Sequence, residues 1–237
     1  NLFVSSVFQN RYNPSIKKLK SFMDDGKFGK LVSASVRLRW CRKQEYYQDN
    51  WHGTWKMDGG VICQQAIHHL DALNWILGPA KSVCAEMGNQ VNELEAEDTM
   101  VGIIKFESGC LATIEVTTAA RPRDFEASIS IVGEKGIAQV GGIALNKVDV
   151  WDFIDSNESI EEVSQLCDIE VPNGMGFGHL DYLNDLITCL SSDGAKIPME
   201  VPESTNALEL VHALYSSVEQ GGWINLDDKN RSKFLGK

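Results

Sequence analysis

Four side chains that can form hydrogen bonds or move protons recur at helical spacing in the first third of the chain. Gln64, His68, Asp71 and Trp75 follow one another at intervals of four, three and four residues. On an α-helix this spacing places all four on one face. A neutral imidazole near pH 7 can accept a proton from a hydroxyl group, and a carboxylate one turn away can orient the ring. His68 is therefore a candidate general acid or base, with Asp71 as its candidate orienting partner.

A structural role for the same histidine is the alternative. A lone histidine on a buried helix more often packs in the core than performs catalysis, and Asp71 would then only fix the ring. His69 is about 100° further round the helix, so it is expected to pack or to face an interface. The local pattern makes His68 a candidate and leaves both roles open.

Glycines bound the helix that must carry this row. Gly59 and Gly60 precede it, Gly78 and Pro79 follow it, and no Gly or Pro interrupts the residues between. The double glycine also fits a plain tight turn into a helix. A continuous apolar side is formed by Ile62, Ala66, Leu70, Leu73 and Leu77. We therefore expect one uninterrupted helix over residues 61–77 that lies on a sheet, with its polar row lining a cleft.

The remaining segments predict an α+β fold. Before the helix we expect a buried strand over Leu2–Phe8, a helix from Pro14 to about Asp25 and a half-buried strand over Lys30–Trp40. After Pro79 the apolar residues alternate, which indicates strands over Lys81–Met87, Asp98–Phe106, Cys110–Thr118, Phe125–Val132, Gly136–Val140 and Lys147–Phe153. Two closing helices are expected over Gly178–Leu190 and Glu203–Glu219. The prediction is one domain, residues 1–237, with a large open, mostly antiparallel sheet of about six strands and helices on one face.

Basic and aromatic residues gather just before the central helix. Residues 1–60 carry 11 Lys and Arg against 5 Asp and Glu, although the whole chain has a net charge of −11. The basic side chains alternate with rings over residues 37–47, in the set Arg37, Arg39, Trp40, Arg42, Lys43, Tyr46 and Tyr47. Such a segment could hold an anionic, ring-bearing ligand, or it could be a strand with a solvated basic face. The spacing favours neither.

Composition excludes several classes of protein. The acidic balance argues against a nucleic-acid surface, and no apolar run is long enough for a membrane span or a signal peptide. The six cysteines are scattered without metal-ligand spacing, so we expect buried free thiols in a cytoplasmic protein and no metal site.

Four stretches together resemble the C-terminal domain of the Gfo/Idh/MocA oxidoreductase family. They are Phe8–Pro14 with Gly26–Gly29, the segment Gly59–Asp71, the turn Gly133–Gly136, and Gly178-His179 with Ala207–Leu210 and Tyr215–Ser217. The resemblance covers essentially the whole chain. The segment 51–55 (WHGTW) followed by 59–71 is most similar to nucleotide-sugar 3-dehydrogenases, which oxidise C3 of UDP-N-acetylglucosaminuronic acid with NAD.

The resemblance implies roles only for positions that match. His68 falls on the family's acid/base histidine. Gln64 falls where the family usually has Asp or Asn, and because Gln cannot ionise, it could only orient substrate or ring. For the substrate cleft of the intact enzyme the expected residues are Arg11, Tyr12, Trp51, Trp55, Gln64, Asp71 and His179.

The family's cofactor apparatus is absent from this sequence. A dinucleotide fingerprint needs G-x-G-x-x-G between a strand and a helix, and the nearest approach, residues 174–178 (GMGFG), has the wrong spacing. The family's Glu-Lys-Pro segment with its catalytic lysine is also missing. We therefore expect a substrate-binding and oligomerisation domain, inactive alone, whose NAD or NADP would be bound mainly by an N-terminal dinucleotide-binding domain that is not in this chain.

Partners follow from the same reading. We expect a sugar or nucleotide-sugar substrate, and self-association as a homo-oligomer through the uncovered face of the sheet. Two alternatives stay open: another sugar or inositol dehydrogenase of the same family, or a non-catalytic sugar-binding or scaffold protein that retains the fold.

Overall fold

The alternating segments form one open sheet in the computed structural model, which describes residues 4–172, 174–192 and 198–237. Within these ranges the sheet has eight strands in the order β7-β6-β5-β1-β4-β3-β2-β8. Their bounds are β1 Leu31–Arg39, β2 Ala80–Gly88, β3 Thr99–Phe106, β4 Leu111–Thr117, β5 Glu126–Gly133, β6 Gly136–Gly141, β7 Lys147–Phe153 and β8 Ile224–Asn225. Neighbouring strands are antiparallel except β1 and β4, which are parallel. The expected α+β class and mostly antiparallel sheet are confirmed.

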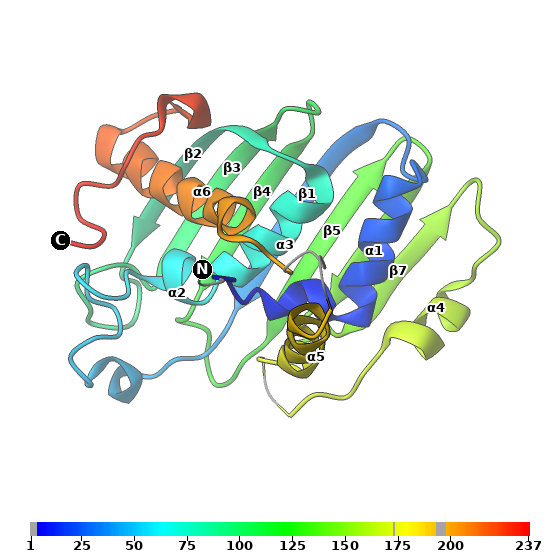
Figure 1. Cartoon of the computed structure of the whole chain (residues 1–237). Coiled ribbons are helices and arrows are strands. Elements are labelled where there is room, and N and C mark those ends of the chain that lie inside the picture. The colour runs from blue at the N-terminus through cyan, green and yellow to red at the C-terminus, as the bar shows by residue number, and fades with distance from the viewer. Residues whose placement is uncertain (1–3, 173, 193–197) are drawn as a thin grey trace.

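Helices cover one face of this sheet (Figure 1). The three that lie along it are α1 Pro14–Asp24, α3 Ile67–Leu77 and α6 Val201–Gln220. The others are α2 Val61–Gln64, α4 Ile160–Cys167, α5 Gly178–Leu190 and the 3₁₀ turns η1 Gln9–Tyr12, η2 Gln44–Tyr47 and η3 Leu226–Asp228. Every helix in the described ranges is too short or too polar to cross a bilayer.

The core lies between these helices and the sheet. Alternate residues of β1, namely Ala34, Val36 and Leu38, are buried beneath them, as are Ile104 and Ile114 of β3 and β4. A fully buried side chain of the size of leucine or isoleucine stabilises the fold by about 1.5–3 kcal/mol. The period-two pattern that predicted the strands is therefore the pattern of burial.

The strand expected over residues 2–8 is not present as predicted. Residues 1–3 lie outside the described residues, and Ser5 makes only an isolated bridge with Glu200. Phe8 is buried in a second, smaller cluster with Tyr182 of α5 and Ala207 of α6. Of the described apolar residues of this segment, Phe8 thus packs on helices, whereas Val4 and Val7 are exposed.

The prediction of a single helix over residues 61–77 is also wrong. A turn at Gln65 and Ala66 divides this segment into α2 and α3. The amide of Ala66 donates to the carbonyl of Val61, five residues back, at 2.8 Å, so one extra residue enters the turn. Gln64 therefore does not continue the row of His68, Asp71 and Trp75, because the helical phase changes between them.

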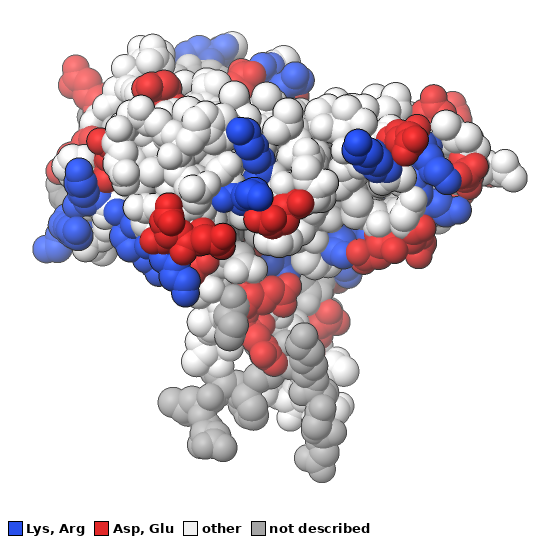
Figure 2. Space-filling model, turned by 90° about the horizontal axis from the view of Figure 1, so that it is seen from above, with Lys and Arg blue, Asp and Glu red and all other residues white. Residues whose placement is uncertain are grey.

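The helix α5 stands away from the sheet. It is seen nearly end-on in Figure 1, and in Figure 2 this region forms a narrow extension from the broad body. Acidic and basic side chains alternate over the body in that view and do not form one basic surface. The first residues of α5 are in contact with η1, which joins the extension to the body.

Candidate functional site

Three segments far apart in the chain meet around His68. The His68 ring packs edge-on against Phe8, with 5.7 Å between ring centroids. The backbone of Gly178 lies so close to η1 that a Cβ atom there would be 2.2 Å from the Gln9 carbonyl oxygen. Since His179 follows directly, the starts of α3 and α5 and the turn η1 enclose one position.

His68 is neutral at neutral pH. Its Nδ1 atom is buried without a hydrogen-bond partner. Burial, with a smaller contribution from nearby His179, lowers the pKa of His68 to about 4. The ring is therefore in the neutral form, which has one unprotonated nitrogen that can accept a proton.

The neighbouring His69 has a packing role, as expected. It is fully buried, with its ring edge-on to Trp40 at 5.7 Å, and burial lowers its pKa to about 3. Adjacent histidines on α3 thus face different surroundings: His68 lies towards η1 and α5, while His69 lies in the core under β1.

Asp71 does not orient His68, so this prediction is wrong. Its two carboxylate oxygens accept hydrogen bonds from Nε and Nη2 of Arg11, both at 2.7 Å. Arg11 also pairs with Glu203 of α6, and its guanidinium lies 5.3 Å from the Trp75 ring centroid. A guanidinium offers its donors in a planar fork that suits a carboxylate, so Arg11 ties η1 to α3 and α6.

Gln64, the last residue of α2, belongs to a second group together with residues of the segment before α2. Its Nε2 atom donates to the Tyr46 hydroxyl at 2.9 Å, while its Oε1 atom is buried without a partner. Tyr46 packs against His52 with 4.1 Å between centroids, and His52 against Trp51 at 3.6 Å. Asp49 Oδ2 lies 2.6 Å from His52 Nδ1. The result is a stack of rings that ends in Trp51, whose side chain is 44% exposed.

Sequence reasoning did not select Tyr46 or His52 as site residues. The available signal was the density of rings at positions 46, 47, 51, 52 and 55, all in a segment outside regular strands. The sequence predicts one possible ligand surface over residues 37–47, which includes Tyr46, but the stacking of Tyr46 on His52 depends on the path of the segment and does not follow from spacing.

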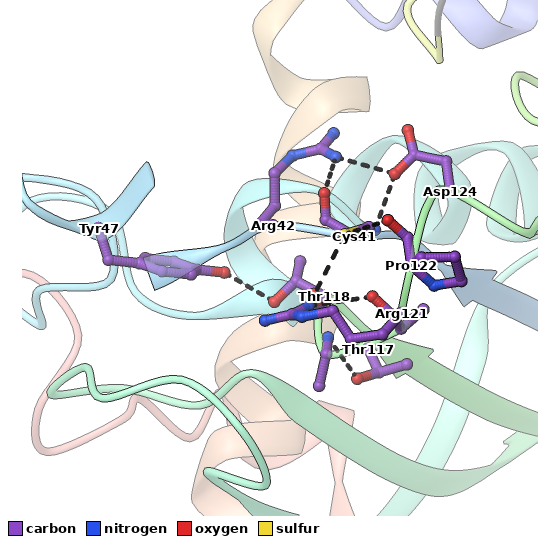
Figure 3. Close-up of polar contacts among 10 residues, drawn as sticks. Cys41, Arg42, Tyr47, Thr117, Thr118, Arg121, Pro122 and Asp124 are labelled. Carbon is purple, nitrogen blue, oxygen red and sulfur yellow. Dashed lines mark hydrogen bonds and ion pairs between the residues drawn. The ribbon is translucent and has the colours of Figure 1, made fainter. Parts of the chain in front are cut away.

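Polar contacts at the end of the sheet hold this segment in place (Figure 3). The Tyr47 and Thr118 hydroxyls are 2.7 Å apart, and Asp124 accepts from the Cys41 amide at 2.7 Å and from Arg42 at 3.1 Å. Arg42 also lies over the ring of Trp40, at 5.1 Å from its centroid. The segment is thus anchored where β1 and β4 end, next to each other.

The basic residues of β1 have protein partners. Arg39 donates to both carboxylate oxygens of Glu115 at 2.7 Å and to Glu126 at 2.9 Å, on the uncovered face of the sheet. Arg37 lies 3.8 Å from Glu126. A hollow of about 520 Å³ on this face is lined in part by Arg39, Glu115 and Arg121, and none of its lining residues belongs to the two groups above.

The other expected residues lie in protein contacts. Tyr12 packs edge-on against Tyr182 of α5 at 6.0 Å, and burial, together with a hydrogen bond to Asp185, raises its pKa. Trp55 packs against Tyr215 at 5.1 Å and Phe234 at 5.5 Å. The structure therefore brings His68 and His179 together, and links Gln64 to Trp51 through two intervening rings.

The chemistry open to this arrangement is proton transfer and ring binding. His68 can take a proton, Gln64 Oε1 can accept a hydrogen bond, and Trp51 can stack on a planar or pyranose ring. Among the residues that the structure describes, no group of three or more His, Cys, Asp or Glu is placed to hold a metal ion.

Comparisons with known proteins point in one direction. The family model described as "GFO/IDH/MocA C-terminal domain" matches residues 16–139, just over half of the chain. The WlbA dehydrogenase of Bordetella pertussis, solved with NADH and UDP-GlcNAcA, is 35% identical over 92% of this chain and 63% of its own, with a TM-score of 0.87. The corresponding enzyme of Chromobacterium violaceum, with the same ligands, is 36% identical over 94% and 62%, with a TM-score of 0.83.

A curated relative agrees over a shorter stretch. The Bacillus subtilis protein named "Putative oxidoreductase YteT" is 33% identical over 78 residues, which are 32% of this chain and 18% of that protein. This chain therefore spans less than two thirds of the length of each of these three relatives.

Proposed function

Because the chain belongs to the GFO/IDH/MocA C-terminal domain family, we propose that it is the substrate-binding part of an NAD(P)-dependent dehydrogenase acting on a nucleotide sugar. The observation that carries the proposal is His68, a buried neutral imidazole, which the resemblance in sequence aligns with the family's acid/base histidine. The two WlbA dehydrogenases, each solved with NADH and UDP-GlcNAcA, support a nucleotide sugar as the substrate class.

In the proposed reaction one C–H and one O–H bond of the substrate break and a carbonyl forms. A bound nicotinamide cofactor would supply the acceptor for the hydride of the ring carbon. His68 takes the hydroxyl proton, so that two electrons and one proton leave as hydride and the second proton stays on the imidazole. The folded pKa of about 4 keeps the ring unprotonated, and therefore able to act, throughout the neutral range.

Substrate binding is assigned to the groups on either side of His68. Gln64 Oε1 accepts from a substrate hydroxyl, and the rings of Tyr46, His52 and Trp51 provide a stacking surface. His179 lies at the start of α5, next to His68, where it can contact the same ligand. Arg11, Tyr12, Asp71 and Trp55 support the site through their protein contacts.

The cofactor is assigned mainly to a separate dinucleotide-binding domain. No G-x-G-x-x-G fingerprint occurs in this sequence, and the matched relatives are longer than the part that this chain covers. The residues around His68 accordingly hold the substrate, and NAD or NADP would meet them from outside the chain.

Calorimetric titration tests the substrate assignment. The chain is expected to bind UDP-N-acetylglucosaminuronic acid with a Kd between about 1 µM and 1 mM, the usual range of KM values for enzyme substrates, and to bind NAD far more weakly. Gln64→Leu should weaken sugar binding about 5- to 10-fold, since one hydrogen bond is lost. Leu166→Ala, on the exposed side of α4, is the control. Tight NAD binding, or equal binding of unrelated sugars without the nucleotide, would contradict the proposal.

Self-association through the uncovered face of the sheet is part of the proposal. Val101 and Ile103 are 54% and 43% exposed there. Three further apolar side chains are also exposed, those of Leu111, Val132 and Ile137. Isolated apolar residues are normal on a surface, but a row across neighbouring strands is typical of an interface. The ion pairs of Arg39 lie on the same face. Because both of its carboxylate partners belong to the same copy of the chain, Arg39 needs no charged residue from a second copy.

Sedimentation equilibrium tests this interface. The wild-type chain is expected to be a dimer or larger at micromolar concentration. Ile103→Arg, which places an unpaired charge in the contact, should weaken association at least tenfold. Leu166→Arg adds the same charge on α4, at a residue of greater exposure, and should leave association unchanged. A monomeric wild type, or equal effects of both changes, would show that the face is simply exposed to solvent.

A further inference from the structure

The first backbone amides of α2 donate hydrogen bonds to residues that are distant in the chain. A helix start leaves backbone N–H groups without partners, and Gly60 has no side chain to cap them. The Gly60 amide donates to the Tyr215 hydroxyl at 2.9 Å, the Val61 amide to the Glu97 carbonyl at 2.9 Å, and the Ile62 amide to Glu97 Oε1 at 3.0 Å. The Tyr215 hydroxyl in turn donates to Glu97 Oε1 at 3.1 Å. Two residues thus supply three consecutive caps.

This arrangement explains one of the two glycines. A Cβ atom on Gly60 would lie 2.1 Å from Glu97 Oε2 and 2.3 Å from the Glu97 carbonyl oxygen, so no other residue fits. The φ angle of Gly60 is −104°, which any residue can adopt. Gly60 is therefore required by the close approach of Glu97 and not by the shape of the turn.

Among the residues that the structure describes, no cation lies beside the Glu97 carboxyl group. It is completely buried, and its Oε2 atom has no hydrogen-bond partner. The titratable groups that face it are Tyr215 from α6, Cys63 from α2 and its neighbour Asp98, with Asp58 beyond Cys63. None of these supplies a positive charge, and an isolated buried carboxylate is very costly, so the neutral acid suits this position.

We propose that Glu97 and Tyr215 form a clamp that positions α2, and with it Gln64, for substrate binding, and that the clamp holds only while Glu97 is the neutral acid. The role of the clamp in substrate binding rests on the function proposed above. Gln64 lies two residues after Ile62, and the turn that follows leads directly to His68. The Ile62 amide and the Tyr215 hydroxyl favour the ionised form of Glu97, but burial of an unpaired charge outweighs them. Ionisation would therefore draw the carboxylate towards water, which releases the first turn. Burial raises the pKa of Glu97 to about 8, which puts this change just above neutral pH.

The pH dependence of substrate affinity tests the clamp. Affinity of the wild-type chain for UDP-N-acetylglucosaminuronic acid should be constant from pH 6.5 to 7.5 and fall about tenfold per unit above pH 8. Burial raises the pKa of Cys63 to about 12 and the pKa of Tyr215 well above its usual value. Neither group should therefore titrate in this interval. Glu97→Gln retains an acceptor but cannot ionise. Its affinity should be about threefold weaker at pH 7, because the amide leaves a buried donor unpaired, and should stay flat to pH 9.5.

Glu97→Ala and Tyr215→Phe complete the set, each weakening binding more than tenfold at pH 7 through loss of caps. The proposal is overturned if Glu97→Gln shows the same alkaline fall as the wild type, or if Glu97→Ala binds normally.

Hydrogen exchange separates this inference from the proposed function. If the wild type binds no nucleotide sugar at any pH, the proposed function fails, and the clamp is judged on the amides of residues 60–62 alone. Their protection, corrected for intrinsic exchange, should fall above pH 8 in the wild type and remain in Glu97→Gln. Protection that does not change with pH in the wild type would overturn the clamp.

Discussion

Replacing His68 with alanine is expected to lower turnover of the nucleotide sugar by about 10²- to 10⁴-fold, the contribution of a positioned general base. The measurement is made on the chain together with the dinucleotide-binding domain proposed above, by following NADH formation. Substrate affinity should change less than about threefold, because the ring acts on the proton in the transition state and adds little to ground-state binding. In the pH profile of kcat/KM, the wild-type value should fall on the acid side near pH 4, where the imidazole of the free enzyme is protonated.

A histidine outside the site is the matched control. His212 of α6 accepts a hydrogen bond from the Ser232 amide at 3.2 Å, near the C-terminal end of the chain. His212→Gln should retain turnover within about twofold, since Gln can also accept that bond. If His68→Ala kept near wild-type turnover with every sugar tested, the acid/base assignment would be wrong, whereas loss of binding with loss of turnover would indicate a structural role.

Replacing Arg11 with alanine is expected to lower the free energy of unfolding by about 3–5 kcal/mol, because it leaves Asp71 buried without its partner. The Asp71 side chain is only 2% exposed, and both of its oxygens are bound by Arg11. For a chain of this size the midpoint of thermal unfolding should fall by about 10 °C. Denaturant and thermal unfolding of the purified chain measure the change.

Two variants distinguish a buried pair from a surface pair. Lys20→Ala breaks the exposed contact with Asp24 on α1 and should cost less than about 0.5 kcal/mol. Arg11→Met combined with Asp71→Leu removes both charges, and should be clearly more stable than Arg11→Ala alone. If Arg11→Ala cost no more than Lys20→Ala, the pair would contribute only as a surface pair does.

Much of the fold was accessible from the sequence because burial follows a simple period. Strands β2 to β7 and helices α1 and α6 were predicted close to their observed bounds, since each presents alternate or helically spaced apolar residues to one layer. Strand β8 and helix α4 were not predicted. The two residues of β8 are too few to show a period, and the place of β1 between β4 and β5 depends on pairings with distant residues.

The site was less accessible for a related reason. His68 was identified by residue type and resemblance, but the partner of Asp71 lies 60 positions earlier and could not be found by helical spacing. The caps of α2 likewise come from remote groups, because the amides of Gly60 and Ile62 donate to Tyr215 and Glu97. Local pattern can indicate that a side chain is polar and on a given face, whereas its partner depends on the tertiary fold.

The central place of β1 has a consequence for how the protein is made. As the earliest strand in the chain, it pairs with β4 and β5, so Ala34 is matched with Ala112 and Ile131, about 80 and 100 residues later. A ribosome that adds about 5–20 residues per second leaves the apolar side of β1 without its neighbours for several seconds. Pairings between such distant residues also make folding slow. The newly made segment that contains β1 therefore needs protection by chaperones until β4 and β5 emerge.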